Sequence, residues 1–309
     1  MEVRVATGDA ESLKRTLRRH KRGNRPPEPA TLADLEVDDE WSTTGGTDPE
    51  NFMIHDSGAQ SADRVIVFAT DEALRHLGQA HEWFIDGTFA CAPKLFHQLY
   101  VIRAPLGDTS VTCVYAFMTG KSQALYEELF RSVNNKCSQL GFQLDPSVVI
   151  SDFEQAVIGA VQNVFGNHVC NRCCFYHLTQ STWRRVQETG LASEYKSNPD
   201  VRHFCGMIDG LAFLPLSDVS EGMTYLRSIA PTEAQPVLDY FDSTYVSGSL
   251  RPIQRPGHTL RMRFRRIRPA FPHPLHYDAM SAAGPALGMF EVFGRTVPPT
   301  LGEGRHFGP

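Results

Sequence analysis

The stretch WFIDGTFACAP, residues 83–93, is the point from which the fold of this chain can be worked out. Its first three residues are large and apolar, which is typical of a buried strand. Asp86 then interrupts the apolar run, and a carboxylate in a buried strand is costly unless a positive group meets it. Asp86 is therefore a candidate functional residue on a strand.

Two further strands are predicted directly after this stretch, LFHQLYVIRAPL (95–106) and TSVTCVYAFMTG (109–120). Gly107-Asp108 joins them and is a strong hairpin signal. Upstream, DRVIVFAT (63–70) also has strand character, and DEALRHLGQA (71–80) predicts a short amphipathic helix. The pattern indicates an antiparallel meander.

A helix is predicted next over residues 122–141, with Ser122 as its N-cap and Gly141 as its C-cap. SVVIS (147–151) is short and apolar, as expected of a central strand. Helices are predicted over residues 153–165 and 173–190. This order predicts an α/β fold, an RNase H-like mixed sheet with flanking helices.

The two ends of the chain differ in composition from this core. Residues 1–57 contain a basic run (13–29) and an acidic, glycine-rich run (34–50), which predict a mostly disordered arm. A charged surface helix and a patch for nuclear targeting or phosphate contact are both consistent with the basic run. Residues 58–250 are the predicted core.

The C-terminal segment, residues 251–309, begins with seven arginines and no acidic residue between Arg251 and Arg268. Such a run is suited to DNA phosphates, although it is also compatible with a solvated loop. The candidate DNA contacts are Arg261, Arg263, Arg265 and Arg266. The tail that follows is rich in glycine and proline and lacks helical periodicity.

A second carboxylate, Asp152, follows the predicted central strand directly. If that strand pairs beside the strand of Asp86, the two aspartates meet at one edge of the sheet. Like charges so close repel unless a cation lies between them, and paired carboxylates suit Mg²⁺ or Mn²⁺. Each aspartate also has a structural interpretation, Asp86 in a bulge or turn and Asp152 as a helix N-cap. Glu154 is a secondary candidate.

Cysteine and histidine side chains are concentrated in NHVCNRCCFYHL, residues 167–178. The candidates for a metal site are His168, Cys170, Cys173, Cys174 and His177, with Cys205 as a distant ligand. A structural zinc needs four ligands, and this stretch offers no second pair downstream, so zinc is the weaker alternative. Cys174 and His177, three residues apart, are expected to brace the edge of the sheet. His177 is also a candidate contact to a DNA phosphate, and buried core cysteines remain an alternative.

Composition narrows the class of protein. The chain has 309 residues, 41% of them hydrophobic, and a formal net charge of −5. No apolar run reaches the length of a membrane span, and the N-terminus lacks the apolar centre of a signal peptide. Seven cysteines, three of them crowded together, favour a reducing compartment, cytosol or nucleus.

Four blocks, 83–102, 148–165, 173–191 and 211–219, resemble in sequence and order the transposase domain of Mutator-like elements, called MULE. The resemblance covers about residues 58–250. It implies an RNase H-like core that holds divalent metal, cuts DNA at element ends and joins it elsewhere. It also implies nuclear location, a homo-oligomer that pairs two DNA ends, and no membrane.

The family's site residues transfer by position in these blocks. The resemblance places its first two aspartates on Asp86 and Asp152 and its Cys-x-x-His motif on Cys174 and His177. Its third acid, a glutamate in a C-terminal helix, has no clear counterpart, and only Glu291 lies at a suitable distance. Nothing upstream of residue 58 resembles the FLYWCH-type zinc finger of animal relatives. A frame shift or sequence decay would produce such a tail.

Three functions therefore stand beside one another. The first is a DNA transposase that catalyses metal-dependent cleavage and strand transfer. The second is a transposase-derived protein that binds DNA or protein without cutting, which the missing glutamate motif favours. The third, weaker, is an interaction module held together by zinc.

Overall fold

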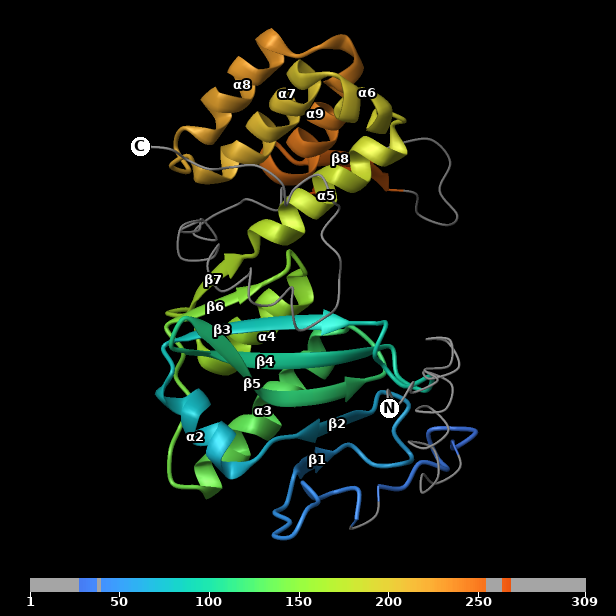
Figure 1. Ribbon diagram of the computed structural model, residues 1–309, viewed down its shortest axis with the longest axis vertical. Helices are drawn as coiled ribbons and strands as arrows, with labels where there is room; N and C mark the ends of the chain where they lie inside the picture. Colours follow the sequence, from blue (N-terminus) through green and yellow to red (C-terminus); the bar gives the residue numbers. More distant parts are fainter. Residues whose placement is uncertain (1–27, 38–39, 254–262, 268–309) are drawn as a thin grey trace, which may run out of the picture.

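The computed structural model describes residues 28–37, 40–253 and 263–267 (Figure 1). Within them a seven-stranded sheet has the order β1-β2-β5-β4-β3-β6-β7. Its strands are β1 Met53–Asp56, β2 Val65–Phe68, β3 Glu82–Thr88, β4 Gln98–Leu106, β5 Thr109–Met118, β6 Val148–Ser151 and β7 Cys170–Cys173.

The sheet is mixed, and β3 is the strand at which its direction changes. β3 pairs antiparallel with β4 and parallel with β6, and β6 pairs parallel with β7. The hairpin between β4 and β5 turns through Gly107, whose φ of 57° is unfavourable for other residues. The predicted pairing of the Asp86 strand with the central strand is therefore confirmed.

Three helices cover one face of this sheet, α2 Asp71–Gln79, α3 Gln123–Gln139 and α4 Gln155–Phe165. Their apolar residues form one core with alternate residues of the strands, such as Trp83 and Ile85 of β3. Ser122 caps α3 as predicted, because its hydroxyl accepts the Leu125 N–H at 3.3 Å. The cap at the other end is Leu140, and Gly141 follows with φ of 89°.

A second group of helices lies at one end of the sheet. α5 Phe175–Glu188 leaves β7 and leads to what we call the helical cluster, residues 192–246 (Figure 1). This cluster consists of α6 Ala192–Ser197, α7 Pro199–Gly210, η1 Leu211–Phe213, α8 Val219–Ile229, η2 Thr232–Ala234, α9 Gln235–Phe241 and the π-helical turn η3 Asp242–Val246. It forms a second apolar core that includes α5.

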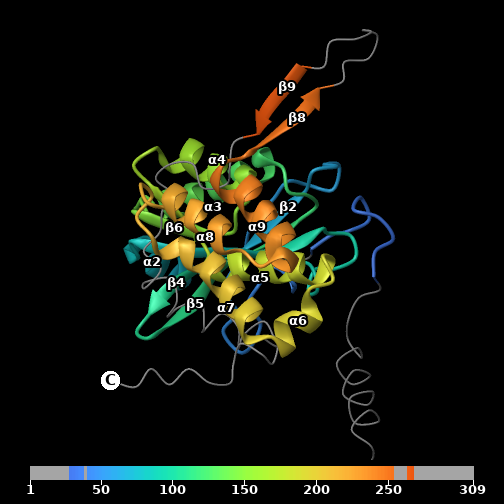
Figure 2. The ribbon, with the colours of Figure 1, turned by 90° about the horizontal axis from the view of Figure 1, so that it is seen from above.

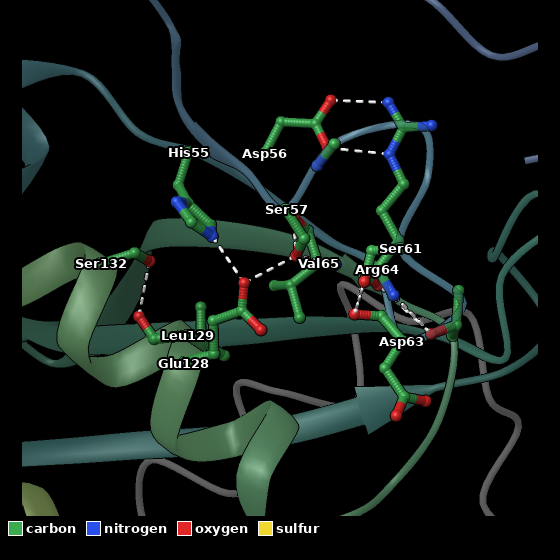
Figure 3. Close-up of polar contacts among 12 residues, drawn as sticks. His55, Asp56, Ser57, Ser61, Asp63, Arg64, Val65, Glu128, Leu129 and Ser132 are labelled. Carbon is green, nitrogen blue, oxygen red and sulfur yellow. Dashed lines mark hydrogen bonds and ion pairs between the residues drawn. The ribbon is translucent and has the colours of Figure 1, made fainter. Parts of the chain in front are cut away.

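Strand β1 was not predicted, and it lies inside the segment 1–57 that was expected to be an arm. Polar side chains fix it to the rest of the sheet (Figure 3). Ser57 donates to Glu128 of α3 at 2.6 Å, and His55 Nε2 lies 2.9 Å from the same oxygen. Arg64, 2% exposed, donates to both carboxylate oxygens of Asp56 and to two backbone carbonyls of residues 32 and 35. The sequence of β1 does not predict a strand, because the residues that stabilise it lie outside it.

Other predicted boundaries move by a few residues. The strand predicted from residue 83 is β3, which begins at Glu82 and ends at Thr88, so Phe89 and the residues after it form a turn. α4 begins at Gln155 with Glu154 in the cap position, so the structural interpretation of Asp152 as an N-cap was wrong. α5 begins one residue after Cys174, which is its cap residue.

A separate pair of strands ends the described chain. β8 Ser249–Ile253 and β9 Arg263–Ile267 pair antiparallel, and Figure 2 shows that they project away from the sheet and helices. Every helix in the described ranges is too short or too polar to cross a bilayer.

Candidate active site

Three residues fall in one row across the parallel part of the sheet. Phe84 lies opposite Ile150 in the pairing of β3 with β6, and counting two residues further along each segment relates Asp86 to Asp152, which directly follows β6. Ser151 lies opposite Cys173 of β7, which puts Cys174 at the next place in the row. We call Asp86, Asp152 and Cys174 the site row. The parallel register therefore brings together two carboxylates that are far apart in sequence.

Asp86 lies on the face of β3 opposite to Ile85 and is partly exposed. Its side chain is 19% exposed, and its Oδ1 accepts the Gly87 N–H at 2.8 Å. His177, in the first turn of α5, places Nε2 3.7 Å from the same oxygen. The positive group that the sequence required for this carboxylate is thus a histidine from a neighbouring helix.

The electrostatic surroundings of His177 favour its charged form. Burial alone would lower the pKa of His177, but its interaction with Cys174 and the charges of Asp86 and Asp152 outweigh burial and raise the pKa to about 9. The ring nitrogen Nδ1 is buried and does not meet the geometry of a hydrogen bond. His177 thus makes an electrostatic contact to Asp86, and the bracing of the sheet edge by Cys174 and His177 stays a prediction.

Asp152 is held in a turn between β6 and α4. Its Oδ1 accepts the Glu154 N–H at 3.1 Å, which fixes the carboxylate relative to the start of α4. Glu154 itself is engaged elsewhere, with Lys121 Nζ at 2.9 Å and the Tyr126 hydroxyl at 3.2 Å. The secondary candidate Glu154 thus forms an ion pair beside the site row.

Buried tyrosines lie behind the carboxylates. The pKa of Tyr100 is well above its ordinary value, mainly because of burial, with Tyr126 and the charges of Asp152, Asp86 and Glu154 adding to the shift. Burial likewise raises the pKa of Tyr126. Both rings therefore stay neutral, and the sum of these effects marks a concentration of negative charge at this edge of the sheet. Lys121 and Tyr126 were not singled out from sequence, and nothing in their local pattern would have identified them.

Two aromatic rings connect the site row to the helical cluster. Phe153, directly after Asp152, packs against Tyr245 of η3 with ring centroids 5.0 Å apart. Phe175, directly after Cys174, packs against Phe213 of η1, also at 5.0 Å. Each of the two loops that carry site residues is therefore anchored in a core formed by residues outside the sheet.

The remaining cysteines and histidines of the predicted zinc cluster are dispersed. Cys173 is buried, and burial raises the pKa of its thiol, which disfavours the thiolate that metals bind. Cys205 is buried in α7, and His168 pairs with Asp145 at 2.7 Å. Across the described ranges, no group of three or more His, Cys, Asp or Glu side chains is arranged to hold a metal.

The other predicted site residues lie at or beyond the limits of the described chain. Glu291 and Arg261 are outside the described residues. Arg263, Arg265 and Arg266 lie in β9, where the pairing places Arg265 opposite Arg251.

Chemically, the row offers two carboxylates at one level of a rigid sheet. Such a pair of hard oxygen donors fits a small divalent cation. The negative charge of the two carboxylates needs a positive partner. His177 supplies part of that charge. The row thus combines two carboxylates with a histidine and a cysteine, Cys174, that interacts with His177.

One protein family matches part of the chain. Residues 82–181 match the family model of the MULE transposase domain. The match begins at the first residue of β3 and ends inside α5, so it includes the whole site row. It is narrower than the span 58–250 suggested by the sequence blocks. A comparison with curated proteins finds no match.

Proposed function

We propose, from the match of residues 82–181 to the family model of the MULE transposase domain, that the protein is a DNA transposase that cleaves and transfers DNA strands at element ends. The observation that carries the proposal is the parallel register that brings Asp86 level with Asp152. The order of three antiparallel strands followed by two parallel ones supports an RNase H-like core.

The residues present suit a divalent metal. Asp86 and Asp152 would hold Mg²⁺ or Mn²⁺, which, when bound, would activate a water or 3′-hydroxyl and offset charge on the phosphodiester. Asp86 is paired with His177, and Asp152 is oriented by the Glu154 N–H. Glu291 remains the proposed third ligand, and zinc remains the weaker alternative.

DNA is the proposed partner, and the β8–β9 hairpin is the proposed place of contact. Its second strand carries Arg263, Arg265 and Arg266, and Arg261 stands two residues before that strand in the sequence. A basic hairpin that projects from the fold suits the phosphate backbone of DNA. Nuclear location and a homo-oligomer that pairs two DNA ends follow from the same proposal.

The competing proposal is a transposase-derived protein that binds DNA or another protein without cutting. One sequence observation favours it, because the glutamate motif of the family has no clear counterpart in this chain and only Glu291 lies at a suitable distance. Both proposals require the fold to be intact, and they differ in whether the row binds metal.

A titration of Mn²⁺ against thermal stability tests the leading proposal. A metal that binds only the folded state at 100 times its Kd stabilises it by about 2.7 kcal/mol. For a domain of this size that corresponds to a rise in Tm of about 5 to 10 °C. We expect this rise in the wild type and its loss in both Asp86→Asn and Asp152→Asn.

Asp145→Asn is the matched control, since Asp145 is exposed and lies outside the site row. It should respond to Mn²⁺ like the wild type. If both row variants also respond like the wild type, the two aspartates share no metal and the binding protein becomes the better proposal. If only the row variants lose the response, cleavage of DNA that carries element ends is the next measurement.

A further inference from the structure

An exposed aromatic ring lies beside the site row and takes no part in the chemistry proposed above. Phe89 follows the end of β3, three residues after Asp86, and is 47% exposed. Its neighbour in the same turn, Phe96, is 8% exposed and packs against Phe117 with ring centroids 5.5 Å apart. The turn thus buries one phenylalanine in the sheet and leaves the other in solvent.

Two polar side chains contact the exposed ring. His97 packs against Phe89 in a T-shaped arrangement, with ring centroids 5.2 Å apart. Lys121 places Nζ 4.8 Å from the ring centroid, so a cation lies over the aromatic face. Both of these side chains suit an anionic ligand.

A short chain of contacts connects this ring to the carboxylates. Lys121 also binds Glu154 Oε2 at 2.9 Å, and the Glu154 N–H donates to Asp152 at 3.1 Å. Two residues, Lys121 and Glu154, therefore link Phe89 to Asp152. A DNA strand whose phosphodiester lies at the site row would bring its adjacent base within reach of the ring.

We propose that Phe89, His97 and Lys121 form a stacking site for an unpaired nucleobase of the DNA strand held at the site row. The identity of the strand as DNA rests on the proposed function. An aromatic ring stacks any base because every base has a π-face, and the lysine ammonium offsets the charge of the adjoining phosphate. The site takes an unpaired base because in a duplex each base is already stacked within the helix.

The test measures DNA binding by the full chain in EDTA, where neither metal nor cleavage contributes. The probes are a single-stranded oligonucleotide that carries one 5-iododeoxyuridine and the same sequence as a complete duplex. Phe89→Leu removes the aromatic face, Phe89→Trp keeps it, and Tyr225→Leu removes a ring that is 59% exposed on α8 in the helical cluster. The readouts are Kd from fluorescence anisotropy and the position of the photo-crosslink.

We expect Phe89→Leu to raise the Kd for the single strand about tenfold, with little change for the duplex. The crosslink should map to residue 89 in the wild type and disappear in this variant. Phe89→Trp and Tyr225→Leu should both bind like the wild type. The Tm of Phe89→Leu should stay unchanged because the ring is exposed.

Two results would overturn the stacking site. If Phe89→Leu binds and crosslinks like the wild type, the site is wrong while DNA remains the partner. The same conclusion holds if its affinity and Tm fall together and Phe89→Trp does not restore binding. A wild type that binds neither probe would overturn the stacking site and the proposed function together.

Discussion

A buried carboxyl group in the helical cluster gives the sharpest prediction for stability. Asp209 of α7 has one carboxylate oxygen, Oδ1, that is buried without a hydrogen-bond partner. Burial raises the pKa of Asp209 from 3.8 to about 7, although a hydrogen bond from Thr182 of α5 acts against the shift. The perturbation is Asp209→Asn, which keeps the shape of the side chain and removes its ability to ionise.

The size of the effect follows from the two pKa values. One pKa unit corresponds to about 1.4 kcal/mol, so ionisation of Asp209 costs the folded state about 4 kcal/mol relative to the unfolded chain. Because the folded-state pKa is raised, this cost is absent below the unfolded value of 3.8 and grows as the pH rises to about 7. Above that pH it is constant.

Urea unfolding at several pH values measures the effect. At pH 8 we expect Asp209→Asn to be more stable than the wild type by about 4 kcal/mol, and at pH 4 the difference should nearly vanish. Asp200→Asn is the control, since Asp200 is exposed in the first turn of the same helix. It should lose about 0.5 kcal/mol through the helix dipole at neutral pH. A difference between Asp209→Asn and wild type that is the same at pH 4 and pH 8 would refute the reasoning.

Three further substitutions test other parts of the structure. Asp56→Asn leaves the buried guanidinium of Arg64 without its carboxylate and should cost about 3 kcal/mol in urea unfolding at pH 7; because the pKa of Asp56 is lowered, variant and wild type should converge as the pH falls below 3.8. Gly87→Ala places a methyl group against the buried Gln98 amide and should cost about 1 to 3 kcal/mol, with a weaker response of Tm to Mn²⁺; an unchanged Tm would show that the amide moves aside freely. Tyr245→Ala removes a ring contact between the helical cluster and the site, so the Tm of this variant should no longer rise with Mn²⁺. The Tm of Tyr245→Phe should still rise, because the ring is kept. If the Tm of Tyr245→Ala rises with Mn²⁺ as in the wild type, the contact between the helical cluster and the site does not contribute to metal binding.

Local sequence patterns determined much of the sheet. Alternating apolar residues, a Gly-Asp turn and a Ser cap are short-range signals, and they located β4, β5 and α3 to within a few residues. Asp86 and Asp152 stood out because a carboxylate that adjoins an apolar run needs a physical reason. The pairing of their strands was confirmed by the register of β3 with β6.

Only the tertiary structure decided what surrounds these residues. β1 escaped prediction because a buried arginine and a glutamate on α3 hold it, and both lie outside its own sequence. The ring contacts that anchor Phe153 and Phe175 join segments separated by tens of residues, so a local sequence pattern cannot predict them. Likewise, the cation over Phe89 comes from the segment before α3. Sequence alone determines which groups prefer burial and which carry charge, but which of them meet depends on how the strands and helices pack, and that packing is set by contacts between distant residues.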